Sequence, residues 1–181
     1  MRELDFYFDF VSPFSYIAFA RLDRLPREVT VRLRPILFAG LLAHWGQSGP
    51  AELAPKRRWT YRWCEWWARS LGVPFRFPAS HPFNPIRHLR LALACGNRRE
   101  AIAEIFTVLW TDGSDPADPQ EFRALAARGV FGVPSFVVES EVFWGADALD
   151  FVKACLADPA ILSTTEMRRL DTLPVGASRT R

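Results

Sequence analysis

The sequence predicts an α/β fold in which a β-α-β unit and a later β-β-α unit are separated by a run of helices. In residues 4–10, LDFYFDF, phenylalanines at every second position alternate with Asp5, Tyr7 and Asp9. Residues 29–34, VTVRLR, show the same alternation of apolar and polar residues after a helical pattern. Residues 135–144 hold two short apolar runs on either side of a tight turn. A period of two is typical of strands, and apolar residues three to four positions apart are typical of helices.

The first helix is predicted to begin at Ser12-Pro13, directly after the first strand. Serine is favoured as the N-cap, and proline is favoured at the first helical position. Apolar residues then recur near helical spacing as far as Leu25, and Pro35 ends the second strand. Two strands joined through a helix are expected to be parallel, with a right-handed crossover.

The middle of the chain is predicted to be helical and rich in aromatic residues. A helix is expected from Pro55 to about Leu71, and the tryptophans at 59, 63, 66 and 67 on one of its faces are expected to be mostly core. Further helices are predicted from Asn84-Pro85 to Ala94, from Arg99 to Trp110, and from a capping box at 118–121 to Gly129.

The last third returns to strands. Residues 135–139 and 141–144 are predicted to form an antiparallel hairpin turning at Ser140. A final helix begins at Gly145-Ala146-Asp147 and ends before Pro159. This order of elements is that of a thioredoxin-like fold. We expect one domain over residues 1–181, with a helical insertion at about 37–128 and a C-terminal tail at about 160–181.

Composition favours a globular protein without affinity for nucleic acid or membranes. The 181 residues carry a net charge of only +3, and the one dense basic run, residues 56–58, is expected to be a solvated first turn or to meet a carboxylated substrate. No apolar run approaches the ~20 residues that span a bilayer, and acidic residues interrupt the N-terminal stretch, so no signal peptide is expected. Cys64, Cys95 and Cys155 are far apart in apolar helical stretches. They favour buried thiols and a cytoplasmic protein.

Ser12 is the first candidate for chemistry. By itself a serine at this position is a helix cap, but in a thioredoxin-like fold the start of the first helix stabilises a thiolate through backbone N–H groups. Redox proteins of this fold carry C-x-x-C there, whereas this chain has Ser12-Pro13-Phe14-Ser15. Such a site cannot form a disulfide of its own, but it can hold the thiolate of a ligand.

Two further motifs could complete a binding site for a peptide-like thiol. The Val133-Pro134 bond enters a strand, and we expect it to be cis and to face the first helix, which would expose the Val133 backbone to pair with a ligand. Ala146 and Asp147 open the last helix. They could receive the carboxylate and ammonium groups of a γ-glutamyl end, although a carboxylate near a helix start is often only stabilising.

Three ordered motifs, FYFDFVSPFSY, GVFGVPSF and FWGADALDF, resemble the 2-hydroxychromene-2-carboxylate isomerase family, which is related to kappa-class glutathione transferases within the DsbA-like thioredoxin superfamily. The resemblance extends from Leu4 to about Leu156. It implies glutathione as cofactor, activated by Ser12 and flanked by Pro13 and Phe14. It also implies that Val133 pairs with the cysteinyl backbone, that Pro134 beside it belongs to the glutathione-binding site, and that Ala146 and Asp147 bind the γ-glutamyl end.

The resemblance implies a glutathione-dependent cis–trans isomerase of a small aromatic or enone carboxylate, acting in aromatic compound catabolism. A kappa-like glutathione S-transferase and a non-catalytic thiol- or peptide-binding module are the alternatives that the sequence leaves open, as it does a homodimer. Relatives carry an asparagine before the PKRR helix where this chain has GQSGPAEL, and the segment from Trp110 to Gly129 is shorter than theirs. No metal is expected, because the three histidines lack ligand spacing.

Overall fold

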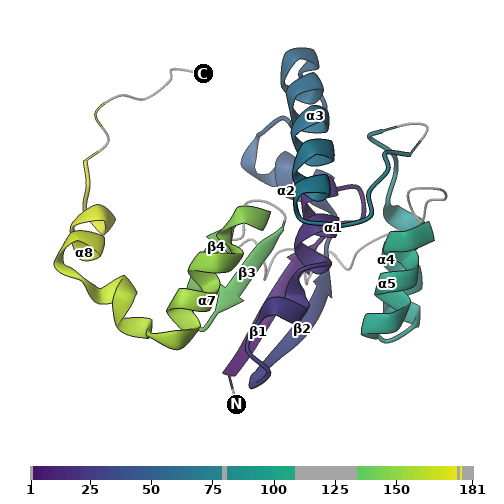
Figure 1. The fold of residues 1–181 in the computed structure, drawn as a ribbon. Helices are drawn as coiled ribbons and strands as arrows, with labels where there is room; N and C mark the ends of the chain where they lie inside the picture. Colours follow the sequence, from purple (N-terminus) through teal and green to yellow (C-terminus); the bar gives the residue numbers. More distant parts are fainter. Residues whose placement is uncertain (1, 79–80, 109–133, 175, 177–181) are drawn as a thin grey trace.

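A four-stranded sheet organises the part of the chain that the computed structural model describes, which is residues 2–78, 81–108, 134–174 and 176. The strands are β1 (Arg2–Phe8), β2 (Val29–Pro35), β3 (Ser135–Val138) and β4 (Glu141–Trp144), in the order β2-β1-β3-β4. β1 pairs with β2 in parallel and with β3 in antiparallel orientation, and β3 and β4 form the predicted hairpin (Figure 1). The predicted thioredoxin-like α/β fold is confirmed.

The helices follow the predicted order with two additions. They are α1 (Pro13–Phe19), α2 (Phe38–Trp45), α3 (Ala54–Ser70), α4 (Ile86–Ala94), α5 (Arg99–Val108), α7 (Leu149–Ala157) and α8 (Thr165–Asp171), with 3₁₀ turns η1 (Leu22–Arg24), η2 (Ala146–Ala148) and η3 (Pro159–Ser163). The sequence patterns missed α2 and α8. α1 ends at Phe19 rather than continuing to Leu25, where η1 takes over. The helix predicted for 118–129 lies outside the described residues.

The main core lies on the face of the sheet to which Leu4, Phe6 and Phe8 point. These three side chains are fully buried against residues of α1, α4, α5 and α7. The Phe8 and Phe106 rings lie 5.6 Å apart, and the Phe6 and Phe136 rings lie 5.2 Å apart. Burial of aromatic rings in offset contact is among the largest favourable contributions to folding. The alternation seen in LDFYFDF therefore anchors β1 at the centre of the domain.

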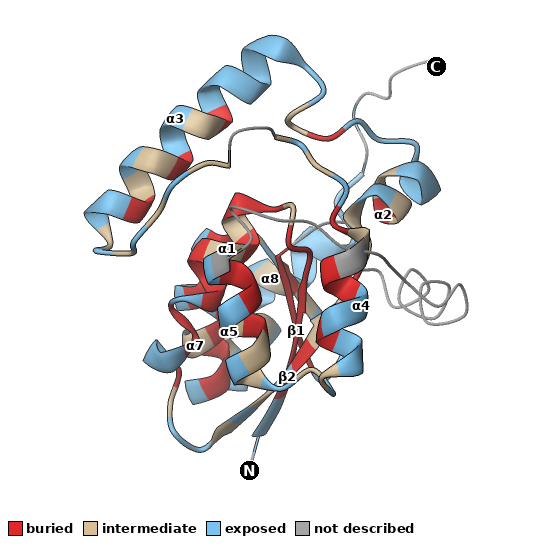
Figure 2. Ribbon diagram, turned by 90° about the vertical axis from the view of Figure 1, so that its right-hand side faces the viewer, coloured by how far each residue is buried: buried red, intermediate tan, exposed pale blue. Residues whose placement is uncertain are grey.

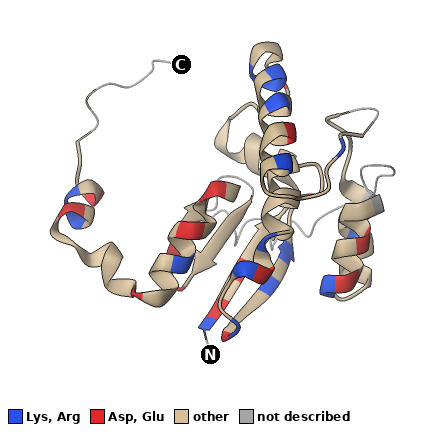
Figure 3. Ribbon diagram, in the orientation of Figure 1, with Lys and Arg blue, Asp and Glu red and all other residues tan. Residues whose placement is uncertain are grey.

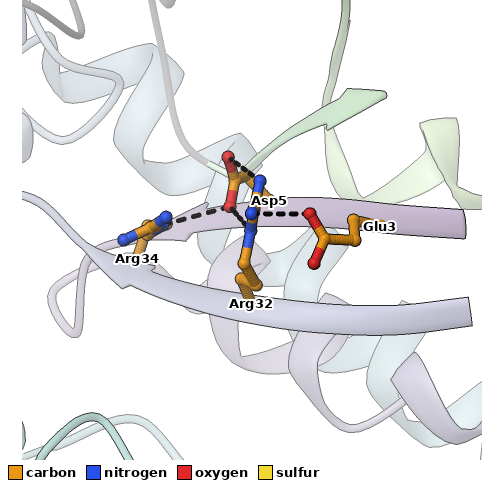
Figure 4. A network of polar contacts seen from close by, with 4 residues as sticks. All are labelled: Glu3, Asp5, Arg32 and Arg34. Carbon is orange, nitrogen blue, oxygen red and sulfur yellow. Dashed lines mark hydrogen bonds and ion pairs between the residues drawn. The ribbon is translucent and has the colours of Figure 1, made fainter. Parts of the chain in front are cut away.

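The opposite face of β1 carries Asp5, whose carboxylate is held by two arginines of β2 (Figure 4). Arg32 donates from Nε to Oδ1 at 2.8 Å and from Nη2 to Oδ2 at 3.2 Å, and Arg34 Nε donates to Oδ1 at 3.1 Å. Burial alone would raise the pKa of Asp5, but the hydrogen bonds and charges of Arg32 and Arg34 outweigh it and hold that pKa below its usual value. The register of β1 and β2, which pairs Asp5 with Arg32, brings these groups together.

α3 is buried along a face that the sequence did not single out. Thr60, Cys64 and Ala68, four residues apart, are its buried residues, and Cys64 and Ala68 pack with Ile17 of α1. The prediction that the tryptophan face is mostly core was wrong, because Trp59 and Trp66 are 66% and 59% exposed. Figure 2 shows that much of α3 is exposed. Small side chains allow the close approach of α1, and the indole ring of Trp63 instead stacks on those of Trp59 and Trp67.

Basic residues accompany the exposed tryptophans on α3 (Figure 3). Lys56, Arg57 and Arg58 are exposed in its first turn, and the Arg57 guanidinium donates to the carbonyl oxygen of Ala51 at 3.2 Å. In the described part of the chain no helix, α3 included, is long and apolar enough to cross a membrane.

The segment expected to be a featureless tail contains η3 and α8. Asp158 caps η3 by accepting from the N–H of Ala160, and Thr164 caps α8 by accepting from the N–H of Met167. Ile161 and Leu162 pack against the main core, whereas no residue of α8 is buried. Local capping thus forms helices here without the core pattern on which the prediction relied.

We predict that Asp5→Asn lowers the free energy of unfolding by about 1–3 kcal/mol, because it removes a charged acceptor from two arginines at a buried position. The loss should be full at neutral pH and shrink as the pH falls below the usual carboxyl value of 3.8, because a carboxyl whose pKa is lowered by folding loses its stabilising effect on protonation. Urea unfolding at several pH values measures it.

Glu3→Gln is the matched control. Glu3 also bonds Arg32, at 2.7 Å, but both side chains are about half exposed. Exposed pairs contribute little, so a change below ~0.5 kcal/mol is expected. Equal losses in the two variants would contradict the assignment of Asp5 as the centre of the network.

Candidate functional site

The turn between β1 and α1 carries the first candidate residue, Ser12. Ser12 is the N-cap of α1, with extended backbone angles, and its side-chain oxygen accepts from the N–H of Ser15 at 3.2 Å. Its own N–H donates to the carbonyl oxygen of Asp9 at 3.1 Å. The capping bond uses an oxygen lone pair, so the Ser12 hydroxyl hydrogen remains able to donate. The predicted cap is confirmed.

Within the described residues, the first turn of α1 leaves one backbone donor for a ligand. Pro13 has no N–H, and the N–H groups of Ser15 and Tyr16 bond to the side-chain and carbonyl oxygens of Ser12. The remaining donor of this turn is the N–H of Phe14, directly after the proline. The Phe14 ring is half-buried and lies 6.5 Å from the ring of Trp67 on α3.

Asp9 lies beneath this turn, fully buried. Its Oδ1 accepts from the N–H of Val11 at 3.2 Å, and its Oδ2 accepts from the N–H of Phe38 at 2.7 Å, which ties the start of α2 to the turn. Its N–H faces Ser15 Oγ at 3.4 Å. Burial raises the pKa of Asp9 to about 7, because backbone N–H donors only partly replace the lost hydration. The sequence did not identify Asp9 as part of the site, although its position three residues before Ser12 is a visible signal.

A second segment reaches the turn from far along the chain. His81 Nε2 lies 2.7 Å from the carbonyl oxygen of Val11, the residue before Ser12. The hydroxyl of Tyr61, on α3, lies 2.6 Å from Nδ1 of the same ring. The His81–Pro82 peptide bond is cis. No sequence pattern pointed to this contact, which spans 70 residues.

The other predicted residues lie at the β3 end and in η2. Pro134 is buried at the start of β3, and its carbonyl oxygen accepts from the N–H of Gly145 at 3.1 Å. Gly145 leads into η2, in which Ala146 is buried and Asp147 is exposed. η2 contacts α1, so the helix that Ser12 caps lies beside the Ala146-Asp147 turn. Val133 lies outside the described residues, and so does the expected cis bond to Pro134.

Gly145 is required by the way in which this turn folds back on itself. Its φ of +106° is unfavourable for any residue with a side chain, and a Cβ atom there would lie 2.4 Å from Oδ1 of Asp147. The Asp147 carboxylate is thus placed directly over the Gly145 backbone, with its outer side exposed. An exposed carboxylate at this point can pair with an ammonium group of a ligand.

The cysteines do not form a redox pair in the described structure. Cys64 and Cys155 are buried, Cys95 is partly buried at the end of α4, and all three are free thiols. Burial raises the pKa of Cys64 to about 12, so it carries no thiolate at neutral pH although it packs against α1. Among residues 2–78, 81–108, 134–174 and 176, no group of three or more His, Cys, Asp or Glu side chains could hold a metal ion.

Comparison with known proteins shows similarity to one family along most of the chain. Residues 3–128 match the DsbA-like thioredoxin domain model. The chain is 31% identical to a 2-hydroxychromene-2-carboxylate isomerase of Sphingobium xenophagum over 193 aligned positions, which cover 87% of this chain and 99% of that protein. It is 29% identical to glutathione S-transferase kappa 2 of Caenorhabditis elegans over 83 positions, covering 44% of this chain and 37% of that one.

A solved structure of a 2-hydroxychromene-2-carboxylate isomerase has the same fold. It superposes with a TM-score of 0.71 and 24% identity, and covers 95% of this chain and 100% of that one.

We predict that the stability of the wild type falls, relative to Asp9→Asn, as the pH rises from 4 to 7. Folding raises the pKa of Asp9 from 3.8 to about 7, so in this range the folded state binds more protons than the unfolded state, and deprotonation favours unfolding. Asparagine does not titrate. The difference in unfolding free energy between the two proteins should therefore change by up to about 4 kcal/mol.

Urea unfolding of both proteins at half-unit pH steps measures this difference, and all other titrating groups are common to the pair. A difference that stays constant from pH 4 to pH 7 would show that Asp9 keeps an ordinary pKa.

Proposed function

The chain belongs to the 2-hydroxychromene-2-carboxylate isomerase family, whose domain is of the DsbA-like thioredoxin type, and on that premise we propose that it is a glutathione-dependent cis–trans isomerase. Its substrate class is a small aromatic or enone carboxylate, of the kind met in aromatic compound catabolism. The observation that carries this proposal is the hydroxyl of Ser12, which caps α1 with a lone pair and retains its hydrogen for a ligand.

Ser12 acts, in this proposal, on the sulfur of glutathione. When bound, glutathione would supply a thiolate nucleophile, whose reversible addition to a conjugated double bond would make that bond single and allow it to rotate. The Ser12 hydroxyl donates to that sulfur, and the N–H of Phe14 is the backbone donor next to it. Hydrogen bonds to a charged sulfur favour the thiolate and lower its pKa. Pro13, which has no N–H, keeps the start of α1 rigid.

The remaining predicted residues hold the two ends of the tripeptide. We assign the cysteinyl backbone to the Val133 backbone, next to Pro134, and the γ-glutamyl end to Ala146 and Asp147. The contact between η2 and α1 and the bond from Gly145 to Pro134 support this assignment, because they bring these elements to one end of the sheet. The exposed carboxylate of Asp147 suits the ammonium group of a γ-glutamyl residue.

A kappa-like glutathione transferase is the second candidate, favoured by the similarity to the nematode kappa enzyme. The same residues would activate the thiol, but the glutathione adduct would be the product rather than an intermediate. Mass analysis of a reaction with an aromatic enone carboxylate separates the two. The isomerase returns all glutathione unchanged, whereas a transferase consumes one glutathione per product. A binding module without catalysis would bind glutathione and give neither result.

A disulfide oxidoreductase is disfavoured by the chemistry of the site. Ser12 and Ser15 stand where redox proteins have cysteines, and Cys64, the cysteine packed against α1, is held as a neutral thiol. We therefore predict no catalysed reduction of insulin. Insulin reduction that survives replacement of Cys64, Cys95 and Cys155 together would contradict the proposed site.

We predict that Ser12→Ala lowers turnover much more than glutathione binding, because most contacts of the tripeptide are assigned elsewhere. The variant loses one hydrogen bond to a charged sulfur, typically ~1.5–3 kcal/mol, or roughly 10- to 150-fold in thiolate stabilisation. The bound thiol should then titrate about one to two pH units higher, which the ultraviolet absorbance of the thiolate measures.

Loss of the N-cap also costs about 1 kcal/mol of stability, so each variant needs a melting curve. Ser15→Ala is the matched control: its buried hydroxyl faces the N–H of Asp9, not the ligand side of the turn, and the thiol titration should not move. Ser12→Cys tests the same position with a thiol. If wild type and Ser12→Ala titrate alike when folded and saturated with glutathione, Ser12 is only a helix cap.

A further inference from the structure

The peptide group that joins Val11 to Ser12 is held at both of its polar ends. Its N–H, on Ser12, donates to the carbonyl oxygen of Asp9 at 3.1 Å, inside the turn. Its carbonyl oxygen, on Val11, lies 2.7 Å from Nε2 of His81, outside the turn. A peptide plane with both ends bonded cannot rotate without breaking one bond, and the orientation of this plane sets the direction in which the Ser12 side chain leaves the backbone.

The partner on each side determines where the His81 proton resides. A carbonyl oxygen only accepts, so Nε2 must carry a hydrogen and donate it to Val11. Nδ1 lies 2.6 Å from the hydroxyl of Tyr61, which donates to it when the ring is neutral. Burial lowers the pKa of His81, and the bond to the Val11 carbonyl only partly opposes this effect. The lowered pKa favours the neutral ring. Tyr61 therefore selects the tautomer that can donate to Val11.

Packing holds the imidazole in this orientation. The Tyr61 ring lies 4.4 Å from Phe77 and meets His81 edge-on at 5.2 Å. Phe77 and Phe83 meet the imidazole edge-on as well, at 5.8 Å and 6.0 Å. The Tyr61 oxygen also lies 2.8 Å from the carbonyl oxygen of His81, so its single hydrogen, which points to Nδ1 when the ring is neutral, can be shared with that carbonyl. One side chain of α3 therefore contacts both the ring and the backbone of this residue. These contacts fix the orientation of the imidazole in which Nε2 faces the Val11 carbonyl oxygen.

We propose that His81 is a positioning residue for Ser12: its Nε2–H, oriented by Tyr61, holds the Val11 carbonyl so that the Ser12 hydroxyl faces the ligand. The proposal rests on the function proposed above, in which Ser12 donates to a bound sulfur. His81 does not touch that sulfur in this scheme. It acts through the peptide plane, and it makes the first turn of α1 depend on α3 and on the segment that follows it.

Three substitutions of His81 separate this role from simple packing. Counted in bonds from Cα, the amide nitrogen of glutamine stands where Nε2 stands in histidine, and the amide nitrogen of asparagine stands where Nδ1 stands. His81→Gln can therefore still donate to Val11, whereas His81→Asn cannot, and His81→Phe keeps the ring without a donor. Tyr61→Phe leaves the histidine but removes the group that selects its tautomer.

Two readouts are measured on each variant. The first is exchange of the Ser12 and Ser15 amide hydrogens by NMR on the protein alone, since these hydrogens bond Asp9 and the Ser12 side chain. The second is kcat and KM for glutathione. His81→Asn and His81→Phe should exchange faster and lose kcat by roughly 3- to 10-fold, the size expected from one hydrogen bond, with KM nearly constant. His81→Gln should restore most of both, and Tyr61→Phe should show a smaller loss.

His44→Gln is the matched control, because His44 is an exposed histidine in the last turn of α2, at the opposite end of that helix from Phe38, which bonds Asp9. Equal behaviour of His81→Gln and His81→Asn at matched melting temperature would overturn the proposal and leave His81 a packing residue. Amide exchange that matches the wild type in every variant would overturn it as well. A wild type that exchanges as expected but turns over no enone with glutathione would instead refute the proposed function and leave the positioning of the turn standing.

Discussion

The chain passes from β1 into α1 within four residues, and three of these, Asp9, Phe10 and Ser12, are buried, so water reaches little of the backbone of this turn. Most of its polar groups therefore need a partner from the chain itself. Asp9 supplies two carboxylate oxygens, to the N–H groups of Val11 and Phe38, and the hydroxyl oxygens of Ser15 and Ser12 accept from the N–H groups of Asp9 and Ser15. His81 supplies the donor for the Val11 carbonyl. α2 and the 81–85 segment each contact the turn through one such partner: α2 brings the N–H of Phe38, and the 81–85 segment brings Nε2 of His81.

The two buried carboxyls of β1 and its turn are accommodated in opposite ways. Asp5 keeps its charge, because Arg32 and Arg34 of the neighbouring strand surround it. Asp9 bonds to backbone N–H groups, and its raised pKa places its titration near neutrality. Their contributions to stability therefore change in opposite directions as the pH rises, Asp5 gaining and Asp9 losing. The acidic group nearer to Ser12 is the one that carries less charge.

α3 contacts the candidate site on one side and is exposed on the other. Its small residues Thr60, Cys64 and Ala68 allow it to lie close to α1, its Tyr61 reaches His81, and its Trp67 reaches Phe14. The helix that was predicted to be an aromatic core element therefore supports the turn that carries Ser12, mainly through Thr60, Cys64 and Ala68 rather than through its tryptophans. A substitution that enlarges Ala68 would press on α1, and through α1 on the Ser12 cap, rather than merely disturb a remote core.

Local patterns determined most of the secondary structure. The alternation of β1 and β2, the Ser12-Pro13 start of α1 and the β3–β4 hairpin are each encoded by neighbouring residues, because a strand face, a cap and a tight turn need no distant partner. The order of these elements and the position of Ser12 at the start of α1 were therefore predictable. Tertiary structure decided what depends on long-range packing. α2 has no side-chain cap of its own, and its first N–H is bonded by Asp9 from 29 residues away. The buried face of α3 and the reach of His81 to Val11 were decided in the same way, since burial and pairing depend on which segments meet.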